Sequence, residues 1–308
     1  MKLSNKQIDK YSELFFYSSS AIVIIFTFFF LYFIFDRALL LFEHTNIIEF
    51  ITGTTWHPRG GVFGIWNFII GTLFVAIVTL CIVTPIGIFT AIFLSEFAPK
   101  KIALIIRPLI ELLVGIPSVI YGILGFLVLE DVFQYNIDPL ISSTLGIFFP
   151  IFYDTTPNSG SGILLTSAIL SIMVIPTIVS ISEDSLRSVS LDHRNASMAL
   201  GATHWETIKK IVLPISFSGI LTGILLGMLR SMSEATAVVM VIGNTHSAPS
   251  SIFDLGSTMT AIIISHAGEA PHGGLMVSSL FGIAVLLFII QMIFSTLINY
   301  IKKRSEVV

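Results

Sequence analysis

The stretch from residue 65 to residue 94 reads IWNFIIGTLFVAIVTLCIVTPIGIFTAIFL and contains no charged residue. A helix of about 20 mainly apolar residues is long enough to cross the hydrocarbon core of a bilayer. The stretch therefore predicts a membrane-spanning helix.

The composition of the whole chain agrees with this prediction. Hydrophobic residues make up 54% of the 308 residues and charged residues only 11%. A soluble domain carries roughly a quarter charged residues, so this chain has too few charges to cover a water-facing surface. The composition therefore excludes soluble, disordered and fibrous proteins and nucleic-acid binding, and it leaves an integral membrane protein.

Six long runs with few or no charges predict six transmembrane helices in an all-α membrane fold. These runs are Leu14–Phe35, Ile65–Leu94, Ala103–Leu129, Ile163–Ser182, Ile211–Ile242 and Leu275–Ile301. A further apolar segment, Leu140–Tyr153, is short and contains Pro150. We interpret it as an interfacial or re-entrant piece, because irregular backbone is tolerated at membrane depth only where protein or water covers it.

The distribution of basic residues predicts the orientation of these helices. With the N-terminus inside, 13 of the 16 Lys and Arg residues fall on the inner side, and only Arg37 and Arg59 fall outside. The outer loop Glu130–Gly162 carries four acidic residues and no basic one. Because cytoplasmic loops carry the excess of Lys and Arg, we expect a multi-pass protein of the cytoplasmic membrane with both termini in the cytoplasm.

The inner loop Ser190–Pro214 has the pattern of two short helices joined at a glycine. Gly201 can adopt a left-handed turn, and Thr203 followed by Glu206 forms a capping box for the second helix. Pro214 then resets the chain direction as the fifth run begins. The alternative interpretation is an ordinary connector that Trp205 anchors at the lipid headgroups.

The spacing of Ala196, Gly201 and the pair Leu213-Pro214 resembles the EAA loop of binding-protein-dependent ABC import permeases. Asn195 and Ser197 depart from the usual Glu and Ala of that loop. The resemblance implies a type I ABC importer permease fold and an ATP-binding subunit on the cytoplasmic side. It also implies a set of residues that couple the two subunits: Ala196, Gly201, Ala202, Trp205, Glu206, Leu213 and Pro214.

Other segments are similar to the phosphate permeases of this class, in particular the PstC type. They are LSEFAP at 94–99, ELLVGIPSVIYG at 111–122, MVIPTI at 173–178, ALGATHWET at 199–207 and AVVMVIGN at 237–244. The match runs from about Phe63 to the C-terminus, which divides the chain into an N-terminal part, 1–62, and a transporter domain, 63–308. The resemblance implies inorganic phosphate as substrate, a homologous PstA-like second permease and an external phosphate-binding protein. A permease for molybdate, tungstate or sulfate remains an alternative, as does a membrane scaffold or sensor that moves no solute.

Ionisable residues inside the membrane are costly and are candidates for function. Arg230 and Glu234 are four residues apart, so on one helix they would share a face and could form an ion pair. They lie in a stretch that resembles the R-A-x-G-E-T motif of phosphate permeases, with Ser233 and Ala235 in place of Gly and Thr. The alternative is a structural pair that fixes helix register.

Arg107 and Glu111 have the same spacing, and we expect them to stabilise the start of the third helix.

The third run contains residues that interrupt a helix, and transporters use such interruptions to build anion sites. From the resemblance and this pattern, the candidate substrate pathway comprises Arg230, Glu234, Gly115, Pro117, Ser118 and Tyr121. The alternative is that glycines such as Gly122 and Gly125 serve close helix packing.

No motif of an enzyme is present. The chain lacks a G-x-x-x-x-G-K-[ST] loop for ATP, an H-E-x-x-H pair and a G-x-S-x-G elbow, so we expect a transport subunit without its own ATPase site or cofactor. His266, Glu269 and His272 share an outer loop, but they make a weak metal site, and we expect a solvated docking surface there.

The predicted orientation can be tested by thiol labelling in a chain whose only cysteine, Cys81, has been replaced. A cysteine placed at Asn158 should react with an impermeant reagent added from outside, because that position falls in the acidic outer loop. A cysteine placed at Ser188 should be protected. The reverse labelling pattern would overturn the orientation.

Overall fold

The computed structural model describes residues 5–154, 159–268 and 274–305. In these residues, six helical segments are long and apolar enough to cross a membrane. They are Tyr11–Phe42, Trp66–Phe97, Ser118–Thr144, Ile163–Ser188, His204–Ser233 and Leu275–Tyr300. The predicted all-α membrane fold with six spanning helices is therefore confirmed.

The elements follow one another in a simple order, and most of them are helices. The first part of the chain contains α1 (Asn5–Phe42), α2 (Ile47–Thr52), the hairpin β1 (Trp56–His57) and β2 (Val62–Phe63), α3 (Trp66–Ile92), α4 (Lys100–Gly115), α5 (Ser118–Leu124), α6 (Glu130–Val132) and α7 (Asp138–Thr144). The second part contains α8 (Ile163–Ser188), α9 (Leu191–Ala199), α10 (His204–Thr207), α11 (Leu213–Ser233), α12 (Thr236–Val241), α13 (Met259–Ala267) and α14 (Leu275–Ser305). The antiparallel hairpin pairs Trp56 with Phe63.

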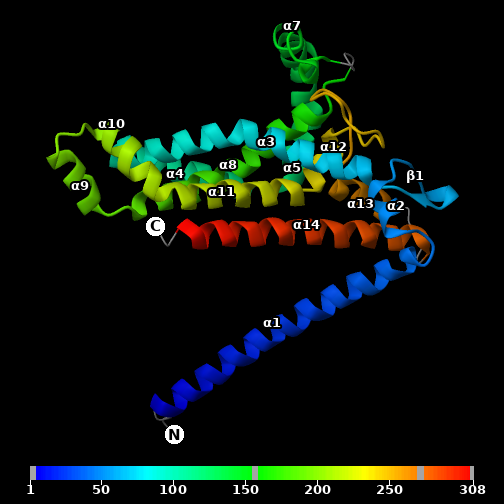
Figure 1. Cartoon of the computed structure of the whole chain (residues 1–308), viewed down its shortest axis with the longest axis horizontal. Helices are drawn as coiled ribbons and strands as arrows, with labels where there is room; N and C mark the ends of the chain where they lie inside the picture. Colours follow the sequence, from blue (N-terminus) through cyan, green and yellow to red (C-terminus); the bar gives the residue numbers. More distant parts are fainter. Residues whose placement is uncertain (1–4, 155–158, 269–273, 306–308) are drawn as a thin grey trace.

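Figure 1 shows a bundle of α3, α8, α11 and α14 with α9 and α10 at one end and the β1 hairpin, α2 and α13 at the other. The start of α1 and the end of α14 lie at the same end as α9 and α10. Helix α1 meets the bundle near its own C-terminal end, where Ala38 and Leu41 are buried and Phe33 packs edge-on against Phe281. The α9–α10 end is the one predicted to face the cytoplasm.

Small residues and hydrogen bonds between helices hold the centre of the bundle. The hydroxyls of Ser167 and Ser171 on α8 donate to the carbonyls of Val75 and Thr79 on α3, each at 3.3 Å. At Gly87 of α3, an added Cβ would lie 2.7 Å from the side chain of Ile178. Because lipid is as apolar as the helix surfaces, such close approach and hydrogen bonding contribute the association that the hydrophobic effect supplies in water.

Two predicted spans are broken in the structure. The run Ala103–Leu129 is not one helix, because α4 ends at Gly115 and α5 begins at Ser118. Ile116 has extended backbone angles, φ −76° and ψ 124°, as expected for a residue that precedes a proline. The spanning segment that begins with α5 continues to Thr144. The apolar segment Leu140–Tyr153, which was predicted to be a separate interfacial piece, therefore begins inside this spanning segment.

The predicted fifth span, Ile211–Ile242, is also two helices. Helix α11 ends at Ser233, Glu234 is extended with φ −69° and ψ 133°, and α12 begins at Thr236. The carboxylate of Glu234 accepts a hydrogen bond from the backbone N–H of Ala237 at 3.3 Å. This bond satisfies one of the donors that a helix start leaves free, so the break is stabilised by its own sequence.

Candidate functional site

The two breaks lie beside each other. Helix α5, which follows the first break, packs along α12, which follows the second (Figure 1). At Gly122 an added Cβ would lie 2.6 Å from the sulfur of Met240 and 3.2 Å from Cα of Ala237. Gly122 therefore lets the two short helices approach closely.

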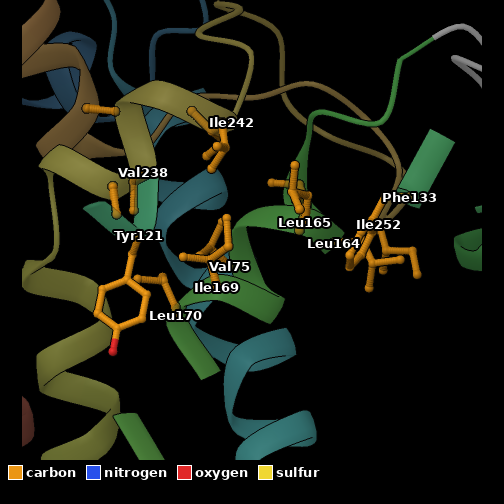
Figure 2. Packing of buried hydrophobic residues seen from close by; sticks show 14 of the residues in the cluster. Val75, Tyr121, Phe133, Leu164, Leu165, Ile169, Leu170, Val238, Ile242 and Ile252 are labelled. Carbon is orange, nitrogen blue, oxygen red and sulfur yellow. The ribbon is translucent and has the colours of Figure 1, made fainter. Parts of the chain in front are cut away.

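Tyr121 ties the first break together. Its ring is buried next to Val238 and Leu170 (Figure 2), and its hydroxyl donates to the carbonyl of Leu113 at 3.0 Å. That carbonyl lies in the last turn of α4, so the bond reaches back across the break. It satisfies a carbonyl that the interrupted helix leaves without its usual partner.

The other pathway candidates of the third span form the break itself. Gly115 and Pro117 are exposed on the surface of this chain and Ser118 is half-buried. An added Cβ at Gly115 would meet nothing within 4 Å. Gly115 and Pro117 directly precede the spanning segment that begins at Ser118, so the break lies at the start of that segment.

The predicted helical pair of Arg230 and Glu234 is wrong. Because α11 ends at Ser233, the two residues do not share a helix face, and no ion pair joins them within the described parts of the chain. Glu234 instead caps α12, and its backbone carbonyl accepts a hydrogen bond from Thr260 of α13 at 2.8 Å. Glu234 is thus a residue that shapes the second break.

Arg230 is exposed, and it shares one face of α11 with Leu226 and Ser233. A charged residue in a spanning helix faces protein or a water-filled cavity, because contact with lipid costs about 3 kcal/mol or more. The open side of α11 is therefore a surface for water, an anion or another subunit.

The inner loop has the predicted architecture. Helices α9 and α10 are joined at Gly201, whose φ of +87° is the left-handed conformation expected there. The capping box of Thr203 and Glu206 is present, and Glu206 pairs with Lys210 at 3.5 Å. An added Cβ at Gly201 would meet no atom within 4 Å, so only its backbone angle requires glycine.

The coupling residues divide into two groups. Ala196, Gly201 and Trp205 are exposed at the tip of the loop, together with the large apolar side chains of Leu191, Met198 and Leu200. Ala202 and Glu206 are partly covered, Pro214 is exposed at the start of α11, and Leu213 packs against the core of the bundle. The tip is an apolar surface at the end of the bundle, and the Leu213-Pro214 pair attaches it to the fifth span.

A buried ion pair joins the loop to the bundle. Arg194 of α9 contacts the carboxylate of Glu96, which lies in the helical turn that follows α3, and the Glu96 side chain is only 2% exposed. Arg194 also donates to the carbonyl of Leu186 at 2.7 Å and to that of Val189 at 3.3 Å. One guanidinium therefore connects α9 with the ends of both α3 and α8.

Aromatic contacts extend this connection. Phe97, next to Glu96, packs edge-on against His204 with ring centroids 5.3 Å apart and lies 6.5 Å from the Trp205 ring. Sequence reasoning missed these roles of Glu96 and Arg194. The segment LSEFAP was singled out only by resemblance, and a contact between residues 98 positions apart has no periodicity that a single sequence could reveal.

The predicted pair of Arg107 and Glu111 is also replaced by a longer-range contact. Arg107 pairs with Glu183 of α8 at 2.8 Å, and Arg187 pairs with the same carboxylate at 3.1 Å. Glu183 is nearly buried, with 8% of its side chain exposed. Arg107 thus holds α4 to α8, and Arg187, which lies on α8 itself, pairs with the same carboxylate within that helix. These residues line a cavity of about 150 Å³ with Glu111 and Asp184.

In the described parts of the chain, no group of three His, Cys, Asp or Glu residues could hold a metal ion. Glu269 and His272, two of the three residues considered in the outer loop, lie outside the described residues.

Comparison with known proteins decides the family. Residues 83–306 match the family described as the binding-protein-dependent transport system inner membrane component. The chain belongs to this family. The type I ABC importer permease fold expected from the inner loop is thereby confirmed.

Two relatives illustrate the similarity. The probable ABC transporter permease protein YqgH of Bacillus subtilis is 38% identical over 262 residues, which cover 84% of this chain and 79% of that protein. The phosphate transport system permease protein PstC of Mesorhizobium japonicum is 35% identical over 265 residues, with the same two coverages. The chain covers most of the length of both relatives.

Solved structures with much lower sequence identity share the fold. A chain of a bacterial alginate ABC transporter, solved in complex with an alginate pentasaccharide-bound periplasmic protein, matches with a TM-score of 0.63 at 15% identity and 96% coverage of both chains. A chain of the MetNI methionine ABC transporter in an inward-facing conformation matches with a TM-score of 0.52 at 15% identity, covering 82% of this chain and 99% of that one. At this identity the match concerns the fold alone.

The exposed charge of Arg230 generates a prediction about transport. Arg230→Gln keeps hydrogen bonding but removes the charge, so solute uptake by the assembled transporter should fall at least about tenfold, whereas Arg230→Lys should retain part of it. Glu234→Gln, which keeps an acceptor for the Ala237 N–H, is the matched control and should assemble normally. Near-normal uptake with Arg230→Gln would contradict a role in the pathway.

Proposed function

We propose that this protein is a permease subunit of an ABC importer that moves inorganic phosphate across the cytoplasmic membrane. Membership of the importer family supports the transport class. The similarity to phosphate transport permeases over 84% of the chain supports phosphate as the substrate. The observation that carries the proposal is the arrangement of two adjacent helix breaks with an exposed, unpaired guanidinium beside them.

The chemistry of the two breaks suits an oxyanion. A guanidinium stays charged in any protein environment and presents planar donors that match phosphate oxygens. Arg230 lies in the last turn of α11, next to the second break, and α12 beyond that break packs against α5. In the proposed pathway the anion passes along the open side of α11. The freed backbone at Gly115 and Pro117 lines part of the same route.

The same open surfaces suit the partners. The apolar tip around Leu200 and Trp205 is proposed to dock in an ATP-binding subunit on the cytoplasmic side, which supplies the energy. The exposed break and the open face of α11 are proposed to be covered by a homologous second permease. An external phosphate-binding protein would deliver the substrate to the opposite end of the bundle, and this chain would have no ATPase site of its own.

The orientation and the domain division complete the proposal. Both termini are proposed to lie in the cytoplasm with the α9–α10 loop, and residues 63–308 are proposed to form the transporter domain, with 1–62 supplying an additional helix and an outer segment. The start of α1 and the end of α14 lie at the same end as that loop, which supports a common side for the three.

Purification followed by reconstitution tests the proposed function. The chain should co-purify with an ATP-binding subunit, and in proteoliposomes loaded phosphate-binding protein should stimulate ATP hydrolysis and phosphate uptake. In Gly201→Val, a β-branched residue would have to adopt a left-handed backbone conformation, which is unfavourable. The variant should therefore still insert in the membrane but show weaker docking of the ATP-binding subunit or weaker stimulation of ATP hydrolysis. The matched substitution Gly268→Val lies at a helix end where φ is −78°, and it should leave coupling intact.

Three outcomes would contradict the proposal. Stimulation by molybdate, tungstate or sulfate and not by phosphate would reject the substrate. The absence of any ATPase partner or solute flux would favour a membrane scaffold or sensor. Full coupling in the Gly201→Val complex would reject the role of the loop.

A further inference from the structure

The end of the bundle opposite α9 and α10 contains a pocket that the proposed transport pathway does not use. Its volume is about 560 Å³, and it lies between the β1 hairpin, the end of α13 and the start of α14. The residues that line it are Trp56, His57, Pro58, Arg59, His266 and Met276. The lining includes a guanidinium and two imidazoles, and among the residues that the structure describes it includes no carboxylate.

Trp56 supplies the least expected feature of this pocket. Its side chain is nearly buried, with the residue 6% exposed, and it packs edge-on against Phe63, Phe68 and His266. Its indole N–H nevertheless has no hydrogen-bond partner among the residues that the structure describes. The indole nitrogen is itself closed off from solvent, so Trp56 contributes the surface of its ring to the pocket wall and no hydrogen-bond donor.

His57 has further capacity to donate. Its Nδ1 atom accepts a hydrogen bond from the backbone N–H of Gly60 at 3.0 Å, which places the ring hydrogen on Nε2. The Nδ1 atom of His266 lies 3.2 Å from the carbonyl of Ile262 and 3.0 Å from the hydroxyl of Ser265, and either tautomer of the ring fits these contacts. The donor that the histidines offer to the pocket is therefore the Nε2–H of His57.

The charges of the surrounding residues favour an anion. Arg59 is exposed and forms no ion pair in the described parts of the chain. Behind His266, the ring of His246 lies 5.9 Å away, and burial, with a smaller contribution from His266, lowers the pKa of His246. His246 lies behind the lining, and Arg59 is the permanently charged residue within it.

We propose that this pocket is a second oxyanion site, at which inorganic phosphate binds on the outer side before it reaches the helix breaks. The proposal rests on the proposed function for the identity of the anion. Arg59 contributes charge and paired donors, His57 contributes its Nε2–H, and the Trp56 ring forms part of the wall. The pocket exceeds the size of one phosphate ion, so water is expected to complete the shell.

Trp56 provides its own probe of occupancy. Substituting Trp66→Phe and Trp205→Phe in the full chain leaves Trp56 as the only tryptophan. In nanodiscs, inorganic phosphate should then change the Trp56 fluorescence with a saturable dependence on concentration. Arg59→Gln should weaken this apparent affinity at least about tenfold, because it removes a charged hydrogen-bonding partner.

Two matched variants separate this site from the others. Arg37→Gln removes the other arginine predicted to lie outside and should leave the titration unchanged. Arg230→Gln should also leave the fluorescence titration unchanged, although it should lower uptake by the complex at least about tenfold. Failure of the proposed pathway and failure of this site are therefore distinguishable. Chloride at equal ionic strength should produce no saturable change.

Two results would overturn the proposal. One is the absence of a saturable response to phosphate at millimolar concentrations in the Trp56-only protein. The other is an Arg59→Gln titration that superimposes on that of the parent protein. If the complex imports sulfate and not phosphate, the proposed substrate fails, and the same titration with sulfate decides this site independently.

Discussion

The buried ion pair between Glu96 and Arg194 is the interaction on which the connection between the inner loop and the bundle depends. The Glu96 side chain is 2% exposed and that of Arg194 is 16% exposed. Removing either partner would leave a buried charge uncompensated, which typically costs about 3–5 kcal/mol. Because Arg194 also binds the carbonyls of Leu186 and Val189, the position of α9 is fixed against the ends of two core helices.

A second connection runs through the backbone. Residues His204–Ser233 form one continuous helical segment of 30 residues that begins at the tip of the loop and ends at the break beside Glu234. In the proposed mechanism, a displacement of α10 would be carried along α11 toward Arg230, and the ion pair would transmit a displacement of α9 to α3. The proposed ATPase would thus act on both sides of the bundle through a single loop, and the two helix breaks are the points at which the helices can yield.

The sequence was sufficient for the features that depend on composition and local chemistry. The absence of charges in long runs predicted six spanning helices, and the left-handed Gly201 with the Thr203–Glu206 box predicted the helical pair of the loop. It was insufficient where distant residues compete for the same partner. Arg107 pairs with Glu183 and not with Glu111, and the helical spacing of Arg230 and Glu234 is lost because the chain leaves the helix at Glu234. The outer pocket combines residues 56–59 with His266, and a single sequence does not show that folding brings these segments together.

The most direct test of the account is a double-mutant cycle on Glu96 and Arg194 in the assembled transporter. Solute-stimulated ATP hydrolysis would be measured for Glu96→Gln, for Arg194→Gln and for the double variant, with basal hydrolysis and subunit assembly as controls. If the ion pair carries the connection, each single change lowers stimulation and the double variant is no worse than the more impaired single variant, with a coupling energy of about 1–3 kcal/mol. Losses that simply add, or stimulation that is unchanged in all three variants, would contradict the account.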